Sequence, residues 1–122
     1  MSHTANNSGK IGEKIAAYYL IMKGYRVIET NYRTRRGEID LICRRGKNLI
    51  FVEVKTRTNN LGGYPEEAVT PVKLQRMEAA IIHYLQTKKI NDLNIQIDVV
   101  GIEFSKLRMP RIHHIPNINF DS

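Results

Sequence analysis

Two acids and a lysine lie in two neighbouring segments of the chain, and their side chains could carry out metal-assisted hydrolysis. Asp40 lies in the segment EIDLICR (38–44), and Glu53 and Lys55 lie in LIFVEVKTR (49–57). Carboxylate oxygens are the ligands that Mg²⁺ or Mn²⁺ prefers in proteins. A lysine beside such a cation can orient or help deprotonate an attacking water and offset charge that builds up on a phosphate. These segments therefore predict phosphodiester chemistry if one surface gathers all three side chains.

A tight hairpin between these segments fixes which residues face one another. Both segments are rich in β-branched residues and predict strands, and Gly46 with Lys47 fits the centre of a type II′ turn. Asp40 then lies opposite Glu53, and Lys55 projects from the same face two residues further on. The other face is wholly apolar, as a core-facing surface requires. It carries Ile39, Leu41, Cys43, Ile50, Val52 and Val54.

Asp40 and Glu53 should repel each other, because like charges in a cross-strand pair are destabilising. Protonation of one acid, the charge of Lys55 and nearby arginines, or a divalent cation between the acids could offset this repulsion. A cation does so most directly, whereas an exposed face of structural salt bridges is the alternative interpretation. Basic residues concentrate around the acids, which favours a phosphodiester substrate. Gly37, which has no side chain, allows the backbone to approach closely at the mouth of the site. These basic residues are Arg33, Arg35, Arg36, Arg44, Arg45, Lys47, Lys55 and Arg57.

The remaining segments predict the helices and strands that must position this hairpin. A helix over 10–23 is apolar around most of its circumference, which predicts cover on more than one side. Thr70 and Pro71 supply the N-cap and the first residue of a second helix that runs to about Lys88. Strands are predicted over 25–30, 93–104 and 111–118, and a Gly-rich loop over 59–64. The order is therefore helix, three strands, helix, one or two strands.

Length and composition restrict the protein to a few classes. The 122 residues are 42% hydrophobic and predict a single domain over 9–122, after an unstructured polar tail over 1–8. No apolar run is long enough for a signal peptide or a membrane span, so we expect a cytoplasmic protein. The single cysteine, Cys43, excludes an internal disulfide. The net charge of +7 favours a polyanionic partner, nucleic acid before an anionic membrane, for which no basic amphipathic helix is present.

The hairpin segments resemble a known nuclease signature. Residues 37–42 (GEIDLI) and 51–57 (FVEVKTR) are similar to the PD-(D/E)XK motif of the restriction-endonuclease-like superfamily. More closely, the chain resembles the bacterial YraN family, whose members have been compared with archaeal Holliday junction resolvases. The resemblance runs from Gly12-Glu13 through residues 68–71 (AVTP) and Lys73 to residues 98–100 (DVV). It implies an α/β, restriction-endonuclease-like fold with a central mixed β-sheet flanked by helices.

The resemblance also implies roles for individual residues. Asp40 and Glu53 would bind Mg²⁺ or Mn²⁺, and Lys55 would be the catalytic lysine. Glu13 matches the first-helix acid that approaches the metal site in resolvase-like members, and a surface salt bridge is its alternative. Ile39 holds the position of the superfamily's proline, as is usual in resolvase-like members.

Several further residues have two interpretations. Gln75 falls where some relatives have a second-helix glutamine, although Ala79 replaces the usual downstream partner. His113 and His114 point to opposite faces of an edge strand, so a shared metal ligand role is disfavoured. Asp98 is either a further acid near the site or, slightly favoured, a buried anchor. The candidates for nucleic-acid binding, which could equally form solvated faces, are Arg35, Arg36, Arg57, Lys73 and Arg76.

Two functions follow from these residues. The leading hypothesis is a metal-dependent endonuclease that hydrolyses DNA in preference to RNA, including branched or junction structures. The second is a non-catalytic nucleic-acid-binding module of the same fold. A homodimer would let such a nuclease act on two strands and is a further expectation.

Overall fold

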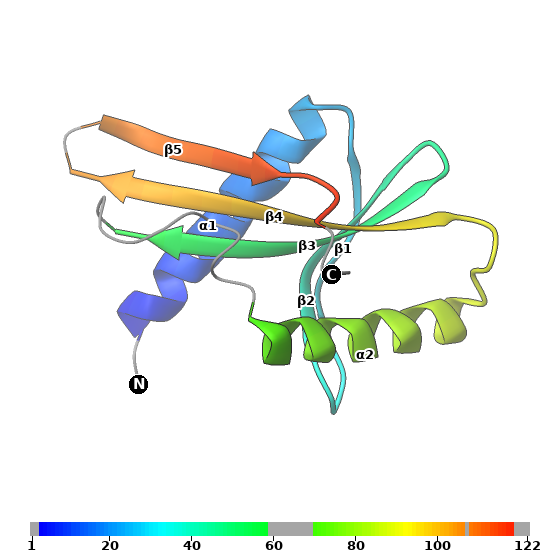
Figure 1. Cartoon of the computed structure of the whole chain (residues 1–122). Coiled ribbons are helices and arrows are strands. Elements are labelled where there is room, and N and C mark those ends of the chain that lie inside the picture. Colours follow the sequence, from blue (N-terminus) through cyan, green and yellow to red (C-terminus); the bar gives the residue numbers. More distant parts are fainter. Residues whose placement is uncertain (1–2, 59–69, 107, 119–122) are drawn as a thin grey trace.

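The computed structural model describes residues 3–58, 70–106 and 108–118, and it places them in two helices and five strands (Figure 1). In chain order these are α1 (His3–Met22), β1 (Arg26–Arg33), β2 (Glu38–Arg45), β3 (Asn48–Arg57), α2 (Pro71–Lys88), β4 (Asn94–Ser105) and β5 (Arg108–Ile115). The predicted order of elements is confirmed, with two strands after the second helix. The loop predicted over 59–64 lies outside the described residues.

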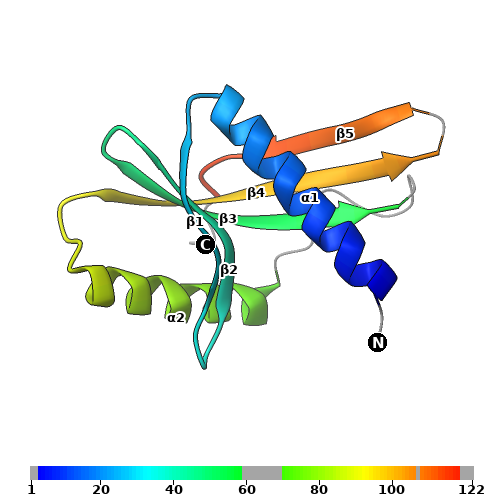
Figure 2. The ribbon, with the colours of Figure 1, turned by 180° about the vertical axis from the view of Figure 1, so that it is seen from behind.

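The five strands form one mixed sheet in the order β1-β2-β3-β4-β5. Neighbouring strands are antiparallel except β3 and β4, which are parallel and are joined through α2, since parallel neighbours need a crossover connection. α1 crosses one face of the sheet and α2 lies against the other (Figure 1, Figure 2). The fold is therefore α/β, with a central mixed sheet flanked by helices, as expected.

Each face of the sheet has its own hydrophobic core. The core beneath α1 includes Ala16, Leu20, Leu41, Cys43, Ile50 and Val52. The core beneath α2 includes Ile39, Ile42, Leu49, Phe51, Ala80, Ile81 and Tyr84. Cys43 is a free, buried thiol whose pKa is raised to about 12 by burial, so it serves as a small core residue.

The β2–β3 hairpin has the register that its turn predicts. Gly46 has a φ of 61°, whereas Lys47 is not among the residues with positive φ, as a type II′ turn requires. Pairing continues up the hairpin to Leu41 opposite Val52. Beyond that pair the two strands separate, at the position of the two acids. The candidate site therefore lies at the point where the sheet opens.

The predicted position of Ile39 is wrong, because β2 bends where it leaves β3. Strand alternation places Ile39 on the face of Leu41, yet Ile39 is fully buried in the core beneath α2, beside Ile42. Among the described strands, this part of β2 pairs with β1 alone, with Ile39 opposite Tyr32. Freed from β3, the strand turns its apolar side toward α2, and the β1–β2 hairpin passes close to that helix (Figure 1).

α1 differs from its prediction in two respects. The helix begins at His3. The expectation of an unstructured tail over 1–8 is therefore wrong for residues 3–8, the part of that tail that the structure describes. Residues 3–8 contain no proline, and extending an existing helix costs less than starting one. α1 is also covered on one side only, because it is the single described helix on its face of the sheet (Figure 2). Four large apolar residues are therefore 51% to 86% exposed: Ile11, Tyr18, Ile21 and Met22.

α2 begins where the sequence predicts. The Thr70 side chain accepts a hydrogen bond of 3.2 Å from the backbone N–H of Lys73, and Pro71 opens the helix. The helix buries Met77 and Tyr84 on its inner face, whereas Val72 at its start is 66% exposed. Neither helix in the described ranges is long and apolar enough to cross a membrane.

Candidate active site

The carboxyl groups of Asp40 and Glu53 meet where β2 and β3 separate. The backbone N–H of Val54 donates a hydrogen bond of 2.8 Å to Oδ2 of Asp40. This bond holds the Asp40 carboxyl against β3, in place of a backbone pair. The two carboxyl groups are themselves joined by a hydrogen bond, which requires one proton shared by the pair. The predicted juxtaposition of the two acids is therefore present.

Burial changes the acidity of both groups. Glu53 is 3% exposed, and its burial together with the negative charge of Asp40 raises its pKa to about 7. Burial also raises the pKa of Asp40, although the hydrogen bond from Val54 opposes the change. The pair therefore retains a proton at pH values where an ordinary carboxyl group has lost it. Of the mechanisms considered for offsetting the repulsion, protonation of one acid is the one that these raised pKa values favour.

A lysine from α2, and not Lys55, completes the charge balance. The Lys73 ammonium forms an ion pair with Oε2 of Glu53, and the Lys73 side chain is 40% exposed. Thr56 lies against Gly12 of α1, so Lys55 projects from the opposite face of β3, the face of Glu53. Lys55 is exposed, and the structure records no ion pair between it and either acid among the described residues. Lys55, one of the alternatives for offsetting the repulsion, therefore does not do so through an ion pair recorded in the described residues.

Glu13 approaches the same acids from α1. Its carboxylate accepts a hydrogen bond from the Asn31 side chain. Partial burial and then the charge of Asp40 raise the pKa of Glu13. Residues from α1, β2, β3 and α2 thus converge on one small region. The role of Glu13 as a catalytic residue stays a prediction.

The donor set fits a hard divalent cation with an open coordination sphere. In the described ranges there is no group of three or more His, Cys, Asp or Glu side chains arranged to hold a metal ion. Mg²⁺, however, is commonly bound by one or two carboxylates together with waters and substrate phosphates. The paired oxygens of Asp40 and Glu53 match that pattern, since both are held by neighbouring strands and both carry raised pKa values.

The start of α2 forms a shallow groove beside the acids. Gly37 lies so close to the backbone carbonyl of Arg76 that an added Cβ would overlap it. The predicted close approach at this glycine is therefore confirmed. The groove has a volume of about 150 Å³ and is lined by Glu38, Thr70, Val72, Lys73, Arg76 and Met77.

The remaining basic candidates lie in the β1–β2 loop, on α2 and near the end of β3. Arg35 and Arg36 are exposed in the β1–β2 loop, and Arg76 is exposed on α2. Arg57 is half-buried near the end of β3, opposite Glu103 in the ladder with β4. Gln75 is exposed on α2 and is not among the residues that line the groove beside the acids.

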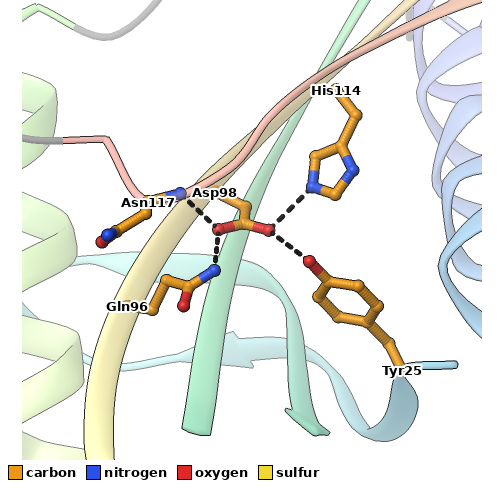
Figure 3. Close-up of polar contacts among 5 residues, drawn as sticks. All are labelled: Tyr25, Gln96, Asp98, His114 and Asn117. Atoms are coloured by element: carbon orange, nitrogen blue, oxygen red, sulfur yellow. Dashed lines mark hydrogen bonds and ion pairs between the residues drawn. The ribbon is translucent and has the colours of Figure 1, made fainter. Parts of the chain in front are cut away.

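Asp98 is a buried anchor on β4 with a set of partners of its own (Figure 3). Its fully buried carboxylate accepts hydrogen bonds from the Asn117 backbone N–H and the Gln96 amide, both at 2.8 Å. It also bonds the Tyr25 hydroxyl at 3.3 Å and Nε2 of His114 at 2.7 Å. These bonds lower the pKa of Asp98 against the effect of burial. The favoured structural interpretation of Asp98 is therefore right.

The two adjacent histidines have separate partners, as the strand geometry predicts. His114 packs edge-on against Tyr19 and Tyr25 and bonds Asp98, whereas His113 lies 2.7 Å from Oε1 of Glu103. They share no ligand in this structure. Both tie β5 to its neighbours.

Lys73 is predicted from the sequence as a phosphate contact, and its contact with Glu53 is not predicted. A signal for that contact exists in the sequence. Lys73 follows the Thr70 cap by three residues, and a cation in the first turn of a helix is opposed by the positive end of the helix dipole. A lysine at that position indicates an acidic partner in the tertiary structure.

Fold and site together define a small α/β protein with two adjacent carboxyl groups, one buried and one half-buried, at an opening in its sheet. The chain belongs to the Uncharacterised protein family UPF0102, the YraN family, whose model matches residues 12–102. A UPF0102 protein of Geobacter sulfurreducens is 43% identical over 116 residues, which cover 95% of this chain and 91% of that protein. A UPF0102 protein of Syntrophomonas wolfei is 45% identical over 109 residues, which cover 89% of this chain and 94% of that protein. The suggested resemblance is confirmed.

A search of solved structures also gives a distant match. The structure of Pyrococcus furiosus SfsA in complex with Ca²⁺ is 17% identical, with a TM-score of 0.45. The match covers 95% of this chain, which spans 65% of the length of that protein.

Proposed function

We propose that this protein is a divalent-metal-dependent nuclease that hydrolyses phosphodiester bonds in DNA, including branched or junction structures. The observation that carries the proposal is the contact between the carboxyl groups of buried Glu53 and half-buried Asp40, with the Lys73 ammonium beside them. Two like charges in a buried site oppose folding, and such arrangements cluster at functional sites. The PD-(D/E)XK resemblance of the same two segments supports the assignment.

The proposed roles follow from where the side chains lie. Asp40 and Glu53 would hold Mg²⁺ or Mn²⁺, and the cation would supply Lewis-acid stabilisation of negative charge on the phosphate. The Lys73 ammonium, which neutralises Glu53 here, would then be available to bind that phosphate. Lys55, on the same face of β3, would orient the attacking water through Nζ. Glu13 would lie beside Asp40 as a further acid, with its pKa raised by partial burial and by the charge of Asp40.

The basic surface supplies the affinity for a polyanion. The net charge of +7 and the exposed cations Arg35, Arg36 and Arg76 favour phosphate contacts, with Arg57 as a further candidate. The likeness of the YraN family to Holliday junction resolvases favours DNA over RNA and a branched substrate. Action on two strands would suit a homodimer, and the exposed apolar side chains of α1 offer a surface for one.

Cleavage assays test this function. Purified protein is incubated with labelled duplex, single-stranded and four-way-junction DNA, with Mg²⁺, Mn²⁺ or EDTA. We expect metal-dependent cleavage that is lost in Asp40→Asn and Lys55→Ala and retained in Glu78→Gln, a change of an exposed acid on α2. No cleavage of any substrate, or equal cleavage by Asp40→Asn, would overturn the proposal.

A second candidate function is nucleic-acid binding without catalysis. The observation that favours it is the ion pair of Lys73 with Glu53, which together with the shared proton satisfies the acids without a metal. This alternative predicts salt-sensitive DNA binding that neither divalent cations nor Glu53→Gln affects. Binding that strengthens with Mn²⁺ in the wild type alone would exclude it.

A further inference from the structure

A second groove lies along the same seam between α2 and the β1–β2 hairpin, on the far side of the Gly37 contact. We call it the arginine groove. It has a volume of about 720 Å³ and is lined by Arg33, Thr34, Arg35, Arg36, Ala79 and His83. The groove beside the acids involves the start of α2, whereas the arginine groove involves the middle of that helix. The packing of Gly37 on the Arg76 carbonyl separates the two.

We propose that the arginine groove is a second phosphate-binding subsite, which holds the backbone of the cleaved strand a few nucleotides from the carboxylate pair. This inference rests on the proposed nuclease function and adds the path and the length of the bound strand. Phosphate contacts of this kind position a nucleic acid without reading its sequence.

The loop that carries the arginines is held in one conformation. The Thr34 hydroxyl donates to the Gly37 carbonyl at 3.0 Å and accepts from the backbone N–H groups of Arg36 and Gly37 at 3.2 and 3.1 Å. The Thr34 N–H also donates to the Gly37 carbonyl at 2.8 Å. The loop backbone is therefore fixed by its own hydrogen bonds and by the packing of Gly37 on α2. Little backbone entropy is lost when Arg35 or Arg36 binds a ligand.

The charges in the groove are available to an anion. Arg33 makes a long, exposed ion pair of 3.5 Å with Glu38, which contributes little. Arg35 and Arg36 are exposed, and no ion pair to either is recorded among the described residues. Nδ1 of His83 lies 2.5 Å from the Tyr32 hydroxyl, which fixes the imidazole at the wall of the groove. Exposed guanidinium groups on a rigid turn are well suited to backbone phosphates.

Helix geometry gives the spacing between the two grooves. Lys73 and His83 lie ten residues apart on α2, and Arg76 and Ala79 fall between them at helical spacing, so all four share one side of the helix. Ten residues at 1.5 Å each span about 15 Å. One strand of a duplex rises about 3.4 Å per phosphate along the axis and also winds around it, so successive phosphates lie further apart than this rise and fewer than four nucleotides cover that span.

Binding assays without metal test the subsite independently of catalysis. The variant Arg35→Gln/Arg36→Gln is compared with Arg26→Gln/Lys47→Gln, which also removes two exposed positive charges. Arg26 lies at the start of β1, about 23 Å along the strand from the loop. Lys47 lies in the turn at that same end of the sheet, which corrects the prediction that it is one of the basic residues around the acids. Fluorescence anisotropy with a labelled duplex in EDTA gives the affinity at 50 to 200 mM salt.

We expect the salt slope of log affinity to fall by about 1.8 in Arg35→Gln/Arg36→Gln, since each lost phosphate contact removes about 0.9. The ratio of wild-type affinity to variant affinity then changes about 12-fold between 50 and 200 mM salt. The control variant should keep the wild-type slope. Equal slopes in both variants, whether reduced or not, would overturn the proposal.

Cleavage assays separate the subsite from the proposed function. If the nuclease assignment and the subsite both hold, Arg35→Gln/Arg36→Gln raises KM and leaves kcat unchanged. Substrates too short on one side of the cut to reach the arginine groove then show the same KM with the wild type as longer substrates show with that variant. If the variant shows the expected change in salt slope but the wild type cleaves no substrate, the nuclease assignment fails and the subsite stands. Wild-type KM in the variant would refute the subsite alone.

Discussion

Replacing Glu53 by glutamine should stabilise the metal-free protein at alkaline pH. The Glu53 carboxyl is almost fully buried against Asp40, so its ionised form is disfavoured in the folded state. Glutamine has nearly the same shape, stays neutral at every pH and can still donate a hydrogen bond to Asp40. Lys73 would lose its partner, but its side chain is 40% exposed and can be hydrated.

The size of the effect follows from the pKa of Glu53. This pKa is about 7 in the folded protein against an ordinary value of 4.5. At 1.36 kcal/mol for each tenfold change in proton affinity, the difference corresponds to about 3 kcal/mol. Below pH 4.5 both states hold the proton and this group costs nothing. Between pH 4.5 and 7 only the folded state keeps the proton, so stability falls as pH rises, and above about pH 7 the whole cost is present.

Urea unfolding in EDTA at pH 5 and pH 8 measures this difference. We expect Glu53→Gln to exceed the wild type at pH 8 by up to about 3 kcal/mol and to approach it at pH 5. Glu78→Gln, a change of an exposed acid, should match the wild type at both pH values. A Glu53→Gln protein that is less stable than the wild type at pH 8 would refute the reasoning.

Three further substitutions test other contacts by their free energies of unfolding. Gly37→Ala should cost about 1 to 3 kcal/mol, because its Cβ would overlap the Arg76 carbonyl, whereas Gly9→Ala, with open space around it, should gain up to about 1 kcal/mol. Asp98→Ala should cost about 3 to 5 kcal/mol through loss of its hydrogen bonds. Because the pKa of Asp98 is lowered, its contribution should persist above pH 3.8 and disappear as pH falls below it, which acid titration by circular dichroism would check. Thr70→Ala should cost about 1 kcal/mol as a lost N-cap.

The sequence determines the hairpin and its acids well, because two independent constraints agree there. A glycine that tolerates positive φ sets the turn, and an apolar face sets which side is buried. Either alone would leave the register open by one residue. Together they place Asp40 beside Glu53, and the Thr70-Pro71 pair in the same way sets the start of α2.

Features that depend on contacts between distant segments are the ones that sequence reasoning misses. The turn of Ile39 toward α2 depends on the separation of β2 from β3, which strand periodicity does not contain. The exposure of Tyr18 depends on how many elements cover one face of the sheet. The contact of Lys73 with Glu53 joins residues from α2 and β3. Periodicity describes one element at a time, so none of these follows from it.

Calorimetric titration of Mn²⁺ into the protein at pH 6.5 tests the central claim, that Asp40 and Glu53 form a metal centre. The account predicts one site per chain, with proton release that makes the heat depend on the buffer, because the acids share a proton that a cation must displace. Asp40→Asn and Glu53→Gln should abolish this heat, and Glu78→Gln should retain it. No binding by the wild type, or unchanged binding by Glu53→Gln, would contradict the account.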